Sequence, residues 1–195
     1  MTLLREFVTL DYDKALIKEA KDKGEPVVLK KALLQRADAP NQNNRIYKKA
    51  ILEREIDRYM KVVKENRALG ELDHPSDSVV NLKNVSHVIR DVWWSGNEVY
   101  GSVEILPTSA GKIVRDLIES NITLGISSRG IGDTIRDEAT GYDSVDESFQ
   151  LICFDLVSEP STVNAFLFES KGIQIPVDNR LFKVNSILDS ILKKR

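Results

Sequence analysis

Cysteine and histidine are scarce in this sequence, and their scarcity excludes several kinds of site. Cys153 is the only cysteine among 195 residues, so no disulfide can form within the chain, and a reducing compartment suits it. The two histidines, His74 and His87, lack the His-Glu-X-X-His or Cys-X-X-Cys spacing that fixes zinc ligands on one element. We therefore expect no metal and no cofactor. A metal held by both histidines and Asp73 is the weaker alternative, which sensitivity to chelators would reveal.

Long apolar runs and an excess of one charge are also missing. No stretch approaches the roughly 18–20 apolar residues of a membrane span, and residues 1–6 lack the basic and apolar parts of a signal peptide. The 28 basic and 30 acidic side chains leave a net charge of −2, which gives no electrostatic reason to expect a nucleic acid or an acidic membrane as partner. These absences predict a soluble, intracellular globular protein.

Hydrophobic periodicity predicts an α+β domain with several strands and packed helices. Strand patterns occur at residues 3–10, 26–35, 85–94, 99–106, 122–135 and 149–157. Helical spacing, with caps at Asp11 or Asp13 and at Thr108 or Ser109, predicts helices that end near residues 23, 65 and 121. Polar loops are expected at residues 38–45, 70–76 and 136–144.

The character of the chain changes after Pro160. Residues 1–169 are expected to form one domain, and residues 170–180 read as a linker. Residues 181–195 then carry an apolar stripe at helical spacing and end in three cations, which suit the C-terminus of a helix. We predict a short amphipathic helix appended to the domain.

The segment 125–130, Gly-Ile-Ser-Ser-Arg-Gly, places two hydroxyls between glycines inside an apolar strand pattern. Glycine lets another backbone approach closely, so such a break can present a small nucleophile. By itself such a segment is far more often an ordinary turn or bulge. A catalytic interpretation therefore needs a base, an orienting acid and an oxyanion site elsewhere in the chain.

His74 and Asp155 are the residues that could complete such a site. His74 lies in a polar loop, held extended by the following proline, where a general base is well placed. Asp155 stands among apolar neighbours and needs a partner, which a histidine can supply. With Ser127 these residues have the types of a Ser-His-Asp triad, and Arg129 and Gly130 could lend backbone amides to the oxyanion.

The remaining reactive residues have simpler interpretations. Cys153 has apolar neighbours, so burial should raise the pKa of its thiol and make it a core residue. His87 lies in an alternating run of a predicted strand, where a half-buried or edge histidine is the ordinary expectation. Neither residue is expected to take part in catalysis.

Several motifs together resemble the prohead core protein proteases of T-even-type tailed phages, distant relatives of herpesvirus capsid maturation proteases. The matching pieces, in the family's order, are Asn44-Arg45-Ile46-Tyr47, Ala68-Leu69-Gly70-Glu71-Leu72-Asp73-His74-Pro75, residues 91–101, Gly125-Ile126-Ser127-Ser128-Arg129-Gly130 and Pro160-Ser161. They cover roughly residues 41–165. The residues before 41 and after about 170 carry little of the resemblance.

The resemblance implies a serine endopeptidase with a mostly antiparallel β-barrel flanked by helices, like the herpesvirus enzymes. His74 would be the base and Ser127, the first serine of its motif, the nucleophile, with Ser128, Arg129 and Gly130 as oxyanion or supporting residues. Herpesvirus relatives use a second histidine located after the serine, and this chain has none. Asp155 is our choice for the third member over Glu159.

The resemblance also implies substrates and a location. Such proteases cut capsid and scaffold precursors inside the prohead, in the host cytoplasm, after Glu in Leu/Ile-X-Glu contexts. This chain has that triplet at Glu169 and Glu6, where we predict self-cleavage, and at Glu19, Glu53 and Glu119, which predicted helices should hide. A homo-oligomer is compatible with this role. The alternative is an inactive scaffold or capsid-core protein that kept the protease fold.

Overall fold

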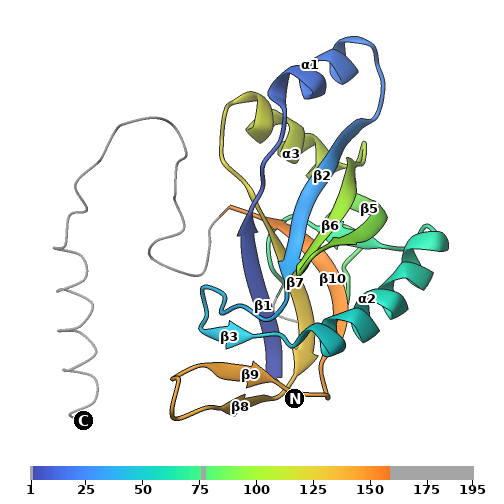
Figure 1. The fold of residues 1–195 in the computed structure, drawn as a ribbon. Coiled ribbons are helices and arrows are strands. Elements are labelled where there is room, and N and C mark those ends of the chain that lie inside the picture. The colour runs from blue at the N-terminus through green and yellow to red at the C-terminus, as the bar shows by residue number, and fades with distance from the viewer. Residues whose placement is uncertain (1, 76–77, 159–195) are drawn as a thin grey trace, which may run out of the picture. The chain divides into compact units, whose positions relative to one another are not determined.

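The computed structural model describes residues 2–75 and 78–158 of the chain (Figure 1). Its elements, in chain order, are β1 (Thr2–Thr9), α1 (Lys14–Asp22), β2 (Val27–Arg36), β3 (Arg45–Ile46), α2 (Lys49–Lys64), β4 (Leu69–Glu71), β5 (Val85–Ser95), β6 (Glu98–Ile105), α3 (Ser109–Glu119), β7 (Gly125–Gly132), β8 (Thr134–Arg136), β9 (Asp143–Val145) and β10 (Gln150–Val157). The linker and helix predicted for residues 170–195, together with Glu159 and Glu169, lie outside the described residues.

The described strands form three sheets. One has the order β1-β7-β10, a second β2-β6-β5-β4, and a small third β3-β9-β8. All ladders are antiparallel except β3 with β9. The prediction of a mostly antiparallel α+β fold flanked by helices is therefore confirmed.

The two larger sheets meet along one side without closing into a barrel. Leu72, just after β4, forms a parallel bridge with Leu156 of β10, and the Asp73 amide donates to the Leu156 carbonyl at 2.7 Å. Within the described residues this bridge is the only pairing between the two sheets. The closed barrel implied by the resemblance is thus not confirmed, but the bridge brings the segment after β4 onto β10.

The helices begin where the sequence predicts. Asp13 accepts a hydrogen bond from the Ala15 amide at 2.8 Å ahead of α1, and Thr108 accepts one from the Gly111 amide at 3.0 Å at the start of α3. The apolar stripe of α2 is buried against the sheets, with Met60 only partly covered; its members recur at helical spacing and are Leu52, Ile56, Tyr59, Met60 and Val63. Among the described helices, none has the length and apolarity needed to cross a bilayer.

The core lies between the two larger sheets and under the helices. Its largest cluster joins residues of β2, β5, β6, β7 and β10 to α2 and α3, including Ile89, Val103, Val114, Ile126 and Phe154. A second cluster around Tyr47 and Phe149 ties α2 to the small sheet. The β5–β6 hairpin turns at Gly96, which has φ 63°, between the strands predicted at residues 85–94 and 99–106.

Three boundaries differ from the prediction. The segment 70–76 is not a loop throughout, since Gly70 and Glu71 belong to β4 and pair with β5. The loop expected at 136–144 includes the start of β9, and the strand expected at 122–135 begins at Gly125 and is divided into β7 and β8. Strands of three residues are too short to show alternation, so the hydrophobic pattern could not reveal β4 and β9.

Candidate active site

Strand β7 carries the two serines and lies between β1 and β10 (Figure 1). Ser127 is the cross-strand partner of Asp155 on β10. Cross-strand partners share a face of a sheet, and neighbours along one strand alternate. Ser127, Arg129 and Asp155 therefore lie on one face, which we call the site face, while Ser128 lies on the opposite face, which we call the core face.

The two serines differ in their partners. Ser128 Oγ accepts a hydrogen bond from Gln35 Nε2 at 2.9 Å on the core face, where Gly130 also lies. Ser127 is 1% exposed, and its Oγ has no hydrogen-bond partner, His74 included. Burying a hydroxyl unpaired costs about 1–3 kcal/mol, so such a group calls for an explanation beyond stability.

A bulge in β10 sets the register that places Asp155 opposite Ser127. Leu151 pairs with Gly130 and Cys153 pairs with Arg129, which leaves one extra residue, Ile152, on β10. Helix α2 holds this region from the other side. Glu55 accepts a hydrogen bond from the Leu151 amide at 3.0 Å, and Arg54 donates to the Phe149 carbonyl at 2.7 Å.

The segment from Gly70 to Pro75 brings His74 to the same face. A Cβ at Gly70 would lie 2.1 Å from the Phe154 carbonyl oxygen and 2.2 Å from His87 Nε2, so only glycine lets β4 approach this closely. Asp73 has φ 69°, in the left-handed region, and its amide is bonded to β10. These contacts turn the chain so that His74 faces Asp155.

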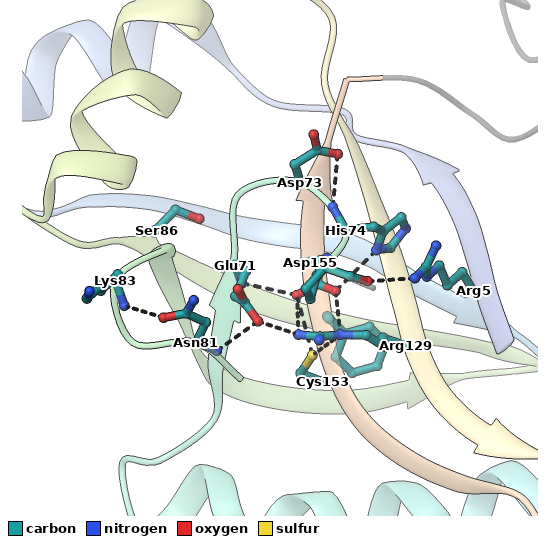
Figure 2. A network of polar contacts seen from close by, with 12 residues as sticks. Arg5, Glu71, Asp73, His74, Asn81, Lys83, Ser86, Arg129, Cys153 and Asp155 are labelled. Atoms are coloured by element: carbon teal, nitrogen blue, oxygen red, sulfur yellow. Dashed lines mark hydrogen bonds and ion pairs between the residues drawn. The ribbon is translucent and has the colours of Figure 1, made fainter. Parts of the chain in front are cut away.

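His74 and Asp155 are in contact on the site face (Figure 2). His74 Nδ1 lies 3.3 Å from Asp155 Oδ2; the histidine side chain is 16% exposed and the carboxylate is fully buried. An ionised carboxylate can only accept, so in neutral His74 the Nδ1–H donates and Nε2 is left with a free lone pair. The structure thus joins two of the three predicted triad members and sets the third on the adjacent strand.

Arg129 lies beneath this pair as a buried cation. Its Nε is 2.9 Å from Asp155 Oδ2, its Nη2 is 2.8 Å from Glu71 Oε1, and all three side chains are fully buried (Figure 2). The Glu71 amide also donates to Asp155 Oδ1 at 3.1 Å. One cation is thus shared by two buried acidic side chains, one of which, Asp155, also contacts His74.

The neighbours of Asp155 decide its charge. Burial alone would raise the pKa of Asp155, but the hydrogen bond with His74, the charge of Arg129 and the Glu71 amide outweigh burial, so its pKa lies below the usual value. Asp155 is therefore ionised at neutral pH. Burial raises the pKa of the Cys153 thiol, as predicted, although Cys153 lies on the site face, where Arg129 Nε donates to its Sγ at 3.2 Å.

His87 has a structural position. It is fully buried, donates from Nε2 to the Phe154 carbonyl at 3.0 Å, and lies 2.9 Å from the Ser86 hydroxyl at Nδ1. Burial lowers the pKa of His87 to about 4, against smaller opposing effects of Asp155 and the Phe154 carbonyl. The expectation of a half-buried or edge histidine is wrong. The His87 ring is fully buried, because β4 lies against it at Gly70.

Glu6 lies on the core face of β1, opposite Ser128. Its carboxylate is 1% exposed and is bound by four side chains, Asn41, Asn43, Arg45 and Tyr47, at 2.6–2.9 Å. The bond after Glu6 also lies within the β1–β7 ladder. The folded domain therefore does not present this bond to a protease, although Glu6 matches the predicted cleavage triplet.

Sequence reasoning missed two residues of the site. Arg129 was assigned only through its backbone amide, whereas its guanidinium is the buried partner of Asp155. Glu71 was quoted within a motif and given no role. The one signal for Glu71 in the sequence is its position within that motif, three residues before the candidate base His74. Among residues 2–75 and 78–158, no cluster of His, Cys, Asp and Glu could hold a metal ion.

Comparison with known proteins gives consistent results. The sequence profile of the family described as "Prohead core protein serine protease" matches residues 9–174. The chain is 35% identical over 156 residues to the prohead core protein protease of Enterobacteria phage T4, covering 76% of this chain and 72% of that protein. The solved structure of the bacteriophage T4 capsid assembly protease matches with a TM-score of 0.69 and 28% identity, over 82% of this chain and 98% of that one.

Proposed function

Because this chain belongs to the family of prohead core protein serine proteases, we propose that it is a serine endopeptidase of phage prohead maturation. Ser127 is the nucleophile, His74 the general base and Asp155 the acid that orients His74. The observation that carries this assignment is the His74–Asp155 contact on the face where Ser127 presents an unpaired hydroxyl.

The proposed chemistry follows from the protonation of His74. Its Nε2 takes the proton of Ser127 Oγ while the oxygen bonds to the scissile carbonyl carbon, and the carbonyl electron pair moves onto its oxygen. His74 then gives the proton to the leaving amine as the C–N bond breaks. Water then attacks the ester formed with Ser127 by the same two proton transfers, and the new C-terminal carboxylic acid of the substrate is released. Asp155 keeps Nδ1–H directed toward itself and stabilises the imidazolium throughout.

The oxyanion site is assigned to backbone amides near Ser128, Arg129 and Gly130. Amides of a central strand normally bond to the neighbouring strands, which leaves few donors free. The β10 bulge lies opposite Gly130 and Arg129, and a bulge interrupts the ladder locally. That interruption supports an available donor at this point and not elsewhere on β7.

The substrates proposed are capsid and scaffold precursor proteins, cut inside the prohead after Glu in Leu/Ile-X-Glu contexts. The name of the T4 relative supports the prohead as the site of action. Self-cleavage is proposed after Glu169. Cleavage after Glu6 is restricted to chains in which β1 has not joined the sheet, because the carboxylate and the bond are otherwise protected.

Intact-mass spectrometry of purified wild type beside Ser127→Ala, after incubation at neutral pH, tests this proposal. Loss of residues 170–195 in the wild type alone is the expected result. Equal cleavage of both proteins would exclude Ser127 as the nucleophile. Labelling with a fluorophosphonate probe, mapped to Ser127 by peptide sequencing, gives a second readout that does not depend on the cleavage site.

An inactive core protein is the second candidate, favoured by the burial of Ser127 and the missing Ser127–His74 hydrogen bond. Catalytic hydrogen bonds are often long in the absence of substrate, so this geometry does not by itself argue against an enzyme. Absence of both probe labelling and cleavage of capsid or scaffold precursors, in assembled proheads as well as in solution, would favour this candidate.

A further inference from the structure

Arg5 brings a second guanidinium to the edge of the candidate active site. It lies on the site face of β1, because its cross-strand partner is Arg129. Its Nη2 donates to the carbonyl of Pro75, the residue directly after His74, at 2.5 Å. The side chain is partly buried, so it reaches the site without being enclosed by it.

The Arg5 guanidinium is short of acceptors. Pro75 O is its only hydrogen-bond acceptor among the described residues, and its Nε is buried without a partner. Most other described arginines pair with a carboxylate, namely Arg36, Arg45, Arg54, Arg58, Arg67, Arg90, Arg129 and Arg136. Arg115 on α3 is the exception that matches Arg5, with one bond to a carbonyl and a buried, unpaired Nε.

The carboxylates nearest to Arg5 are already engaged. Asp155 is bound by Arg129 and His74, and Glu71 is ion-paired to Arg129. Glu6, the next residue along β1, points to the core face and is bound there. Within the described residues, Arg5 forms no ion pair with an acid of the chain itself.

We propose that Arg5 binds the acidic side chain of the substrate residue beside the scissile bond. An arginine offers a planar fork of donors that fits a carboxylate, and charged hydrogen bonds of this kind are the strong ones. The unpaired Nε of Arg5 and the unpaired Oγ of Ser127 lie on the same face of the β1–β7 pair, so one bound peptide could satisfy both. This assignment rests on the proposed function and names the residue that selects the substrate.

Peptide binding to the Ser127→Ala protein tests the proposal without requiring catalysis. The probe is a fluorescein-labelled peptide of residues 165–174, with either Glu or Gln at the position of Glu169. Fluorescence anisotropy should show the Glu peptide binding about 10- to 100-fold more tightly than the Gln peptide, as expected for a charged hydrogen-bonded pair. In Ser127→Ala/Arg5→Gln this preference should vanish, through weaker binding of the Glu peptide alone.

Two variants complete the experiment. Arg115→Gln removes the other unpaired arginine and should leave the preference unchanged. Arg5→Lys keeps the charge and should retain part of the preference, and it stands in if Arg5→Gln fails a thermal-unfolding check. No discrimination between the peptides, or discrimination that survives both Arg5 substitutions, overturns the proposal.

Cleavage assays separate this proposal from the proposed function. If wild type does not cut the Glu peptide while Arg5-dependent binding persists, the assignment of Arg5 stands and the protease mechanism fails. If wild type cuts both peptides with equal kcat/KM and Arg5→Gln behaves likewise, the protease stands and Arg5 is not the selecting residue.

Discussion

Charged side chains are buried on both faces of the β1–β7 pair, but the two faces differ in how many of their polar atoms have hydrogen-bond partners. On the core face, Glu6 is bound by four side chains and Ser128 by one, so each has its partners. On the site face, Ser127 Oγ, Arg5 Nε and Glu71 Oε2 are buried without partners. A satisfied polar cluster stabilises a fold, whereas these three unsatisfied atoms lie beside the proposed triad, where a bound peptide would complete their hydrogen bonding. Tyr59 Oη and Arg115 Nε are also buried without partners, but they belong to α2 and α3.

Substituting each serine separately by alanine is the most direct test of this difference between the two faces. Ser127→Ala should lower kcat/KM on a Leu-X-Glu peptide by about 10⁶-fold, as for loss of a serine protease nucleophile. Ser128→Ala loses only the hydrogen bond to Gln35 and should stay within about tenfold of wild type. A larger loss in Ser128→Ala than in Ser127→Ala would reverse the assignment of the two faces.

Asp155→Asn should reduce activity by about 10⁴-fold, because an amide can hold His74 in the wrong tautomer. The protein should remain folded by circular dichroism, since Asn can still accept from Arg129 and from the Glu71 amide. Asp143→Asn, which changes a partly exposed acid paired with Arg136, is the matched control and should have wild-type activity. Full activity of Asp155→Asn would exclude the triad proposed here.

Arg129→Met should destabilise the protein by about 3–5 kcal/mol, because it leaves two buried carboxylates without their shared cation. Urea unfolding measures the change. The triple substitution that also carries Glu71→Gln and Asp155→Asn should recover part of the loss. A change below about 1 kcal/mol in Arg129→Met would show that the buried pair is not formed in solution.

Glu6→Gln provides the core-face counterpart. It keeps the shape of the side chain but weakens charged bonds, so we expect a loss of about 1–3 kcal/mol in stability with kcat and KM unchanged. Urea unfolding and a peptide-cleavage assay on the same preparation test both halves. A drop in kcat without a drop in stability would mean that the two faces are not functionally separate.

His87 should make the stability of the protein depend on pH. Its pKa is about 4 in the folded protein and 6.5 unfolded, so between these values only the unfolded chain binds the proton. Stability should therefore fall by about 1.4 kcal/mol per pH unit as pH drops through this window. His87→Gln, unfolded in urea at pH 7, 6 and 5, should show a shallower dependence, and an equal slope would assign the effect elsewhere.

The residues proposed for catalysis could be found from the sequence, but their arrangement could not. Ser127, His74 and Asp155 stand out through residue type and unusual surroundings, and the motifs around them resemble a known family. That Asp155 lies opposite Ser127 depends on pairing between strands far apart in the chain and on one bulged residue. Local patterns carry no information on either.

The buried role of Arg129 was hidden for a related reason. An arginine is ordinarily a surface residue, and nothing adjacent in sequence indicates that two acids surround it. The short strand β4 was missed because Gly70 and Glu71 have poor strand propensity, and only the close approach to Phe154 explains the glycine. Helices α1 and α3 were predictable from local caps, and α2, which has no side-chain cap, from its local apolar stripe.

The extra residue in β10 reverses the face of the sheet to which the side chains after it point. In a regular strand, Leu151, Cys153 and Asp155 would all point the same way, so an apolar core residue and a charged site residue would compete for one surface. With Ile152 inserted, Leu151 turns to the hydrophobic clusters while Cys153 and Asp155 turn to the opposite face. A chain lacking Ile152 would have to give up either its packing or its site, so this single position lets one strand serve two surfaces.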